Sequence, residues 1–357
     1  MFGERLQLAR KKAGLSLRGL ADAMAGQVTP QAIGKYERGE MMPSSTVLIA
    51  LVKALGVSME FLAAPLDVKL GAIDFRKSSG TSARDRHNVE ALVLEHVERY
   101  LLVEQVLDLK SAAWEAPFAP RPVGTFEAAE KLASELRESW KLGGDPIPNV
   151  TELLEEKGIK VMLLELPESV SGLTCMIERD DVPPVPVIVV NSLHGIERRR
   201  LTLAHELAHR LFKVSGVAEE KAANRFAGAF LMPAAHLREQ VGKHRNGFGV
   251  AELIVTKRIY AVSAAALLVR FRDLGIIAQE TLTYAFQTFG RTWRKIEPEP
   301  IVTTDKHPRE TPQRFERLCY RALAEGLITI SKASELLRKS VAAIDEEMRG
   351  AIVDDRR

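Results

Sequence analysis

The sequence predicts an α+β fold that is mostly helical, in which an N-terminal bundle of five short helices precedes a domain with a small three-stranded sheet and a HExxH helix. Three observations support this prediction. Residues 1–65 contain repeated helix-capping signals, three short runs between 159 and 190 have strand character, and His205-Glu206-Leu207-Ala208-His209 lies in an amphipathic stretch. A chain of 357 residues is long enough for two or three domains with their own cores.

Composition and charge exclude several classes of protein. Apolar residues make up 46% and charged residues 27%, as in ordinary globular chains. No apolar run approaches the roughly 20 residues that cross a bilayer, and the first residues begin no signal peptide. The two cysteines form no disulfide framework, so we expect a cytoplasmic protein without a membrane partner. Because the net charge is only +3, any contact with nucleic acid must be local.

Residues 1–65 are predicted to form the five short helices. Ser16 is placed to cap the second helix. Thr29-Pro30 gives the third a capping hydroxyl followed by proline at the first helical position. Ser44 or Ser45 caps the fourth, and a turn at Gly56 precedes the fifth. Two helices joined by a tight turn inside a compact helical set describe a helix-turn-helix module.

The run LSLRGLADAMAGQVTPQAIGKYERGE, followed by ALGVSMEFL, resembles the Xre, or phage-repressor-like, helix-turn-helix family. The resemblance implies that the third helix enters the major groove of a double-stranded DNA operator. There Gln31 would pair with adenine and Lys35 with guanine. The residues expected to contact phosphates are Arg18, Thr29 and Arg38, with Gln27 as an addition.

A five-helix bundle of this type can instead serve only for dimerisation or protein binding. Residues 1–65 carry eight Lys and Arg against five Asp and Glu, which is only mildly basic. We favour DNA binding, and we expect a homodimer because repressor-type modules usually read paired half-sites.

Residues 66–125 are predicted to be a linker with a bridging helix. Helical spacing of apolar residues extends from His87 to Lys110, and its charged residues are expected to form a solvated face. The segment 116–124 contains three prolines and a glycine and is predicted to be an extended connection.

Residues 126–285 are predicted to form the second domain. An amphipathic helix begins at Phe126, and a second covers 150–157. The three strands are expected at 159–166, 172–178 and 185–190, the last after a proline-rich turn at 181–186. Cys175 is expected to be a small buried apolar residue. This order of elements is typical of zinc peptidases, in which a sheet edge can receive an extended peptide.

His205 and His209 are four residues apart, so a helix places both imidazoles on one face. A zinc ion with three protein ligands keeps a position for water and lowers the pKa of that water to roughly 7, where a neighbouring carboxylate such as Glu206 can take the proton. A second helix opens at Glu219, where Glu220 can complete the ligand set and Asn224 shares its face. Glu219 is a competing ligand or a solvated charge. The alternative is a buried amphipathic helix that contains the pentapeptide by chance.

The run LTLAHELAHRLF, then E-x-x-A-N-x-F-A, then FLMP, resembles the ImmA/IrrE family of bacterial metallo-endopeptidases. The resemblance implies a zincin-like peptidase domain that binds one Zn²⁺ per chain through His205, His209 and Glu220, with Glu206 as the catalytic base. It also implies a protein substrate, typically a transcription repressor. Some fused members accompany toxin genes as antitoxin-like regulators, so a toxin is a possible partner.

The remainder of the chain is expected to be helical. A helix pair is predicted at 248–258 and 263–274, and His236, His244 or Tyr260 could stabilise an oxyanion, although an exposed histidine or a core tyrosine explains them equally well. Residues 286–357 form a C-terminal helical extension, irregular at 293–312 and then helical at 315–324 and 331–348. These helices are expected to pack on the peptidase or to form a dimer contact.

Taken together, these features predict a DNA-binding transcriptional regulator that carries a zinc-dependent endopeptidase acting on a partner repressor. One alternative is an antitoxin-like or zinc-sensing regulator whose metal site lacks useful proteolytic activity. Glu206 argues against it, because a purely structural site needs no such carboxylate. A broad housekeeping protease is the other alternative, and a fused helix-turn-helix argues against it.

Overall fold

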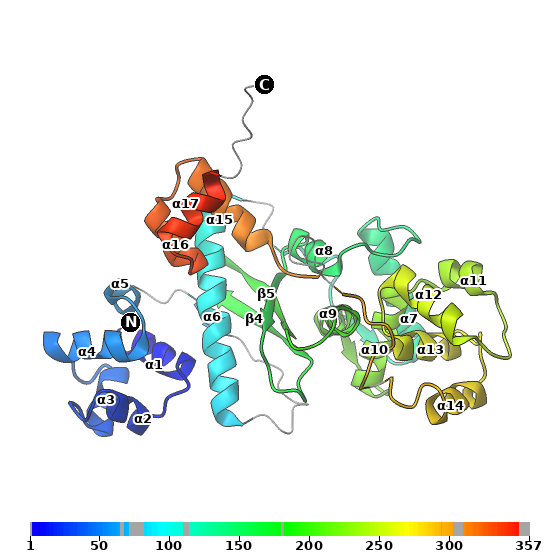
Figure 1. Cartoon of the computed structure of the whole chain (residues 1–357), viewed down its shortest axis with the longest axis horizontal. Coiled ribbons are helices and arrows are strands. Elements are labelled where there is room, and N and C mark those ends of the chain that lie inside the picture. Colours follow the sequence, from blue (N-terminus) through cyan, green and yellow to red (C-terminus); the bar gives the residue numbers. More distant parts are fainter. Residues whose placement is uncertain are drawn as a thin grey trace. The chain divides into compact units, whose positions relative to one another are not determined.

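The computed structural model describes residues 2–64, 68–70, 82–109, 114–179, 182–293, 295–302 and 310–349 (Figure 1). The chain forms two compact units. The first unit contains Met1–Lys110, Cys175–Val185 and Phe315–Arg357, and the second contains Ser111–Thr174 and Pro186–Arg314. Helices predominate and the sheets are small, which confirms the predicted α+β class. No helix among these described ranges is both long and apolar enough to cross a membrane.

The first unit begins with the five predicted helices, and the capping signals account for their starts. Side-chain oxygens of Ser16, Thr29, Ser44 and Ser58 each accept a hydrogen bond from the first turn of the helix that follows. The helices are α1 (Phe2–Lys12), α2 (Leu17–Ala23), α3 (Pro30–Glu37), α4 (Ser45–Leu55) and α5 (Met59–Ala63). They enclose a small core of Leu6, Leu20, Ala21, Met24, Val28, Ile33, Tyr36 and Leu51.

Helix α6 (Ala83–Val106) packs along α1, and the contact between the two is polar. Arg5 is almost fully buried and forms a two-pronged ion pair with Glu98. Lys12 donates to Glu95 over 2.8 Å, and Arg338 contacts the same carboxylate. The helix begins four residues before the predicted start at His87, because Ser82 caps it.

The C-terminal helices belong to the first unit. They are α15 (Arg314–Ala324), α16 (Ile330–Leu337) and α17 (Val341–Arg349). Helices α15 and α16 share a core with α6, and α17 packs against α16. This core contains Tyr100, Val103, Leu107, Leu318, Cys319, Ala322 and Leu336. The sequence predicted one helix over 331–348, and this was wrong: Arg338 adopts a left-handed conformation with φ 56°, which ends α16 and separates it from α17.

The principal sheet has the strand order β1-β4-β5-β3. Its members are β1 (Val68–Leu70), β3 (Lys160–Leu164), β4 (Gly172–Arg179) and β5 (Val182–Asn191). β3 runs parallel to β5, and β1 runs antiparallel to β4. The three predicted strands are present, and β1 adds a fourth that the sequence did not predict.

Two predictions about extended segments were wrong. The proline-rich stretch predicted as a turn is strand from Val182 onward, because β5 already begins there, while Asp181 lies outside the described residues. Its prolines precede Val187, where pairing with β3 starts, so they remove no donor from that ladder. The segment 116–124 is not only a connection, since it contains β2 (Arg121–Val123), which pairs in parallel with β6 (Phe212–Val214).

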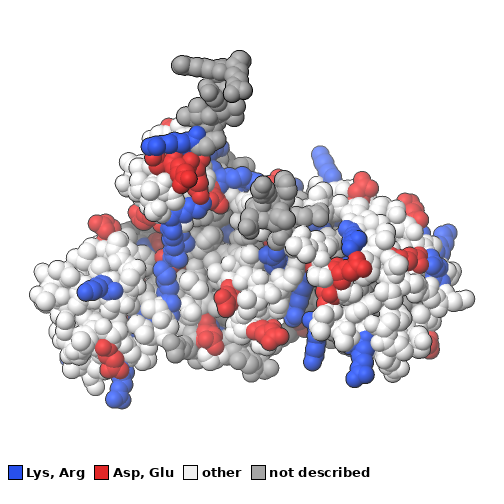
Figure 2. Space-filling view, viewed as in Figure 1, with Lys and Arg blue, Asp and Glu red and all other residues white. Residues whose placement is uncertain are grey.

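The second unit surrounds one large core with helices. They are α7 (Phe126–Ser139), α8 (Val150–Glu156), α9 (Ile196–Leu211), α10 (Glu219–Leu231), α11 (Ala234–Val241), α12 (Val250–Tyr260), α13 (Ala264–Asp273) and α14 (Gln279–Gln287). Helix α14 was not predicted. Helix α10 packs against both α7 and α9, and its small residues Ala222, Ala223 and Ala227 are fully buried there. On the face drawn in Figure 2, basic and acidic side chains are interspersed, as the low net charge suggests.

Candidate functional site

Helix α9 presents the two motif histidines beside the core. Leu203, Ala204, Leu207, Ala208 and Leu211 are fully buried, so this face of the helix is turned toward the core. The histidine side chains, at 13% exposed, are largely covered but still reachable from solvent. Such partial access suits a site that has to exchange a ligand.

Helix α10 brings a carboxylate to these histidines. The Nε2 atoms of His205 and His209 lie 3.2 Å apart, and oxygens of Glu220 lie 3.4 and 3.5 Å from them. A tetrahedral zinc with bonds of about 2.0–2.1 Å requires its ligand atoms to be about 3.3–3.4 Å apart. The three side chains therefore fit a zinc ion, and they are the one such group found among the described residues.

The other ring nitrogen of each histidine faces a side chain on α10. His205 Nδ1 lies 3.0 Å from Asn224 Oδ1, and His209 Nδ1 lies 3.2 Å from Glu219 Oε1. An oxygen acceptor in this place favours the tautomer with hydrogen on Nδ1, which leaves Nε2 free for a metal. Glu219, considered in the sequence as a competing ligand, thus contacts the outer side of a histidine.

Glu206 lies between the two histidines in the sequence and has a different environment. Burial raises the pKa of its carboxyl, and the neighbouring His205 and His209 offset this only in part. No hydrogen bond to the carboxylate is found among the described residues. A carboxylate with a raised pKa is suited to accept a proton near neutral pH.

The start of β4 lies directly against α9 beside Glu206. A β-carbon built at Gly172 would lie 2.5 Å from Thr202 Cγ2 and 2.7 Å from the carbonyl oxygen of Val189. The same β-carbon would be 3.6 Å from Glu206 Cγ. Only glycine allows this close approach of strand and helix, a requirement that the sequence prediction missed.

Asn191 at the end of β5 fixes the loop that leads to Gly172. Its side chain is fully buried. The amide nitrogen donates to the carbonyl oxygens of Leu166, Pro167 and Val170, while Oδ1 accepts from Leu166 N and Leu193 N. A lone asparagine after an apolar strand gave no sequence signal for this role.

The three oxyanion candidates each form a hydrogen-bonding contact with a partner other than His205, His209 or Glu220. His236 Nδ1 lies 2.8 Å from the hydroxyl of Tyr260, and burial raises the pKa of that hydroxyl above its usual value. His244 Nδ1 lies 3.2 Å from the carbonyl oxygen of Gly275. His236, His244 and Tyr260 therefore have structural contacts within α11, α12 and the adjoining loops.

In the helix-turn-helix module, all six predicted DNA-contact residues are exposed. They are Arg18, Gln27, Thr29, Gln31, Lys35 and Arg38. Two of them already have partners. The Thr29 hydroxyl caps α3, and Arg38 forms a two-pronged ion pair with Glu40, with N–O distances of 2.5 and 3.1 Å. In the predicted complex with DNA, Glu40 would compete with a phosphate for the Arg38 guanidinium.

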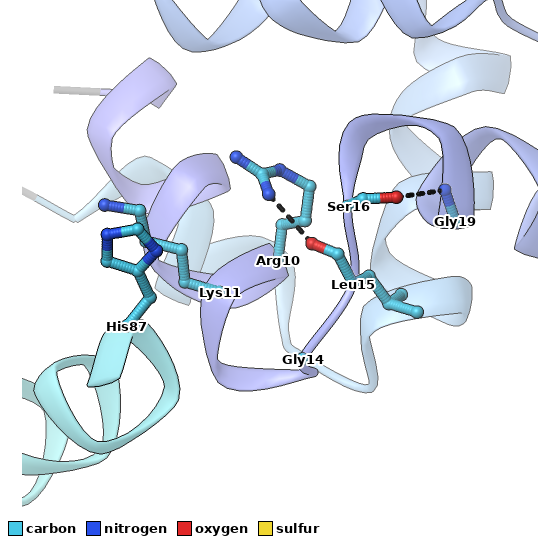
Figure 3. Close-up of a pocket in the computed structure, with 7 residues that line it drawn as sticks. All are labelled: Arg10, Lys11, Gly14, Leu15, Ser16, Gly19 and His87. Carbon is cyan, nitrogen blue, oxygen red and sulfur yellow. Dashed lines mark hydrogen bonds between the residues drawn. The ribbon is translucent and has the colours of Figure 1, made fainter. Parts of the chain in front are cut away.

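A pocket of about 370 Å³ lies between the module and α6 (Figure 3). Arg10 in this pocket is held by Glu37 and by the carbonyl oxygen of Leu15. The pocket is lined by Arg10, Lys11, Gly14, Leu15, Ser16, Gly19 and His87. The sequence did not predict that Lys11 and His87 lie close together, because they are brought together only by the packing of α6 on α1.

Comparisons with known protein families find a match for the helix-turn-helix module and another for the domain that contains His205, His209 and Glu220. Residues 154–272 match the model of the family Peptidase_M78, described as the IrrE N-terminal-like domain, and residues 6–62 match a helix-turn-helix family. No curated protein and no solved structure matches the chain. The first match covers the sheet strands β3 to β5, the metal-ligand group and the helices through α13. The chain therefore joins a region similar to Xre-like helix-turn-helix modules to a region similar to the IrrE/ImmA-like, metallopeptidase-like domain.

Proposed function

We propose that the chain is a DNA-binding regulator whose IrrE-like domain is an active zinc-dependent endopeptidase. The observation that carries the proposal is the convergence of His205 Nε2, His209 Nε2 and Glu220 at separations of 3.2–3.5 Å, beside the partly buried carboxylate of Glu206, whose pKa is raised. His205, His209 and Glu220 would hold the zinc ion. Bound zinc would supply polarisation of a peptide carbonyl and acidification of water.

Glu206 is the proton-transfer residue in this proposal. Its carboxylate takes a proton from the attacking water and delivers it to the departing amine. Asn224 and Glu219 orient the two imidazoles. The start of β4 offers a place for an extended substrate: β1 pairs with Ile177–Arg179 only, so among the described residues Gly172 to Thr174 have a strand neighbour only in β5. We propose a repressor protein as the substrate, because a DNA-binding module fused to the enzyme would bring it to a promoter.

The test measures the zinc content of the purified chain together with the cleavage of repressor proteins encoded near its gene. Wild type is expected to contain about one zinc per chain, and His209→Ala is expected to lose it. Glu206→Gln is expected to retain zinc and DNA binding while hydrolysis falls by about 10²–10⁴-fold. Stoichiometric zinc without cutting in the wild type would instead favour a zinc-sensing or antitoxin-like regulator. Cutting by Glu206→Gln at the wild-type rate would refute the role of Glu206.

A further inference from the structure

Two buried charges, Glu197 and Arg200, lie one turn apart near the start of α9, before the metal-ligand histidines. Lys257 on α12 is fully buried and donates to Glu197 over 2.9 Å and to Glu297 over 2.7 Å. Glu197 also accepts from Ile301 N, and Glu297 accepts from Ala264 N, both over 2.8 Å. The segment around 297–301 is thus tied to the first turn of α9 by charge and by backbone.

Arg200 makes the second cluster with Glu310, and each side chain is only 1% exposed. Glu310 accepts from the backbone N–H groups of Val150 and Thr151 and from the Thr151 hydroxyl, each over 2.9 Å. The Arg200 guanidinium donates to Glu310 and also to the carbonyl oxygen of Ile147. The Glu310 carboxylate therefore joins the start of α8 to α9.

The backbone at Glu310 supports a specific role for its side chain. Its φ is +52°, which is a left-handed conformation. This conformation is energetically unfavourable for any residue that has a β-carbon. Such strained backbone conformations persist where several interactions with the surrounding structure hold the residue in place. The four hydrogen-bond donors on the Glu310 carboxylate are such interactions.

We infer that residues 295–302 and 310–314, here called the strap, position helix α9. Glu310 acts on α9 through Arg200. Glu297 acts on it through Lys257, which contacts Glu197. The inference rests on the proposed zinc site. All strap residues lie beyond 272, the last residue of the family match, so the part of the chain that sets the site extends past the matched domain.

Helix geometry explains why such positioning matters. Side-chain tips lie about 5–6 Å from a helix axis, so a rotation of about 10° moves an imidazole by about 1 Å. An apolar face alone tolerates small rotations, whereas a buried ion pair is satisfied in one orientation only. The strap therefore fixes α9 at the rotation that brings the histidines to Glu220.

The experiment uses the full-length chain, with Glu310→Gln and Glu297→Gln as strap variants. Glu299→Gln is the matched control, because Glu299 lies in the strap but its ion pair with Arg258 is exposed. Leu282→Ala in α14 is a second control, which lowers the melting temperature by opening a cavity on a helix that packs against α13. Zinc affinity is measured by chelator competition, and hydrogen exchange of the zinc-free chain is followed by mass spectrometry.

For Glu310→Gln we expect zinc affinity to fall about tenfold or more, and exchange in 196–211 to rise more than exchange in 219–231. Glu297→Gln should show the same pattern to a smaller degree, and it keeps the test decisive if Glu310→Gln does not fold. Glu299→Gln should match the wild type, and Leu282→Ala should lose melting temperature without losing zinc affinity. Wild-type zinc affinity in both strap variants, or a uniform rise in exchange, would overturn the inference. Absence of zinc from the wild type would refute the proposed function, while the exchange data on α9 would still test the strap.

Discussion

In the helix-turn-helix module the six predicted contact residues are exposed, and local caps set the positions of the helices that carry them. In the proposed metal site, by contrast, both histidines of α9 are largely covered, and the Nδ1 atom of each one faces a side chain on α10. The difference follows from the ligands. A DNA backbone binds at the surface, where exposed side chains can adjust to it. A metal ion requires ligand atoms that are already close together.

The largest effect is expected where the metal site depends on contacts between helices. Asn224→Ala removes the acceptor at His205 Nδ1, and Glu219→Ala removes the acceptor at His209 Nδ1. Each should weaken zinc binding by about 10–100-fold, because the imidazoles lose their fixed orientation. Chelator competition measures this, with the exposed Lys221→Ala on the same helix as the control. Unchanged affinity in both variants would mean that packing alone orients the histidines.

The close approach of β4 and α9 gives a second prediction. In Gly172→Ala the new β-carbon meets Thr202 and the carbonyl oxygen of Val189 at 2.5 and 2.7 Å, so the strand or the helix has to shift. We expect a loss of about 1–3 kcal/mol in the free energy of unfolding, measured by denaturant titration. Gly144→Ala is the control, because a β-carbon there meets nothing within 4 Å. Equal stability of the two variants would contradict the tight packing at Gly172.

Local signals in the sequence predicted a large part of the molecule. Capping residues such as Ser16 and Thr29 act within one helical turn, so the pattern alone predicts where α2 and α3 begin. The HExxH spacing likewise places His205 and His209 on one face of a helix. These features were predicted because their causes lie within a few residues of one another.

Other features depend on partners that are distant in the sequence. Glu310 contacts Val150, Thr151 and Arg200 across more than a hundred residues, and no short pattern announces this. Strand β5 includes prolines that precede its pairing with β3, which starts only at Val187. The expectation that the C-terminal helices pack on the peptidase or at a dimer contact likewise missed α6, since their apolar faces alone specify no partner.

A third prediction concerns the competition for Arg38 in the DNA-binding module. Glu40→Gln removes the charged partner of Arg38, so the guanidinium becomes available to a phosphate. Binding to DNA from upstream of its own gene should tighten, and the slope of log affinity against log salt should steepen by up to about 0.9. The exposed Glu60→Gln on α5 is the control. A decrease in affinity would indicate that Glu40 holds Arg38 in the orientation that DNA requires.

The smallest effect is a pH dependence at the contact of α1 with α6. Burial alone would raise the pKa of Glu95, but hydrogen bonds from Arg338 and Lys12 outweigh it and the net shift is downward. A carboxylate with a lowered pKa in the folded state contributes stability above its unfolded pKa of about 4.3, and that contribution is lost as the pH falls through the folded value. The wild type should therefore melt at a higher temperature than Glu95→Gln by a constant margin from pH 5 to 8, and the margin should shrink below about pH 4.3. Glu90→Gln on the same helix is the control variant. A margin that does not depend on pH would mean that packing at this position, rather than its charge, joins the module to α6.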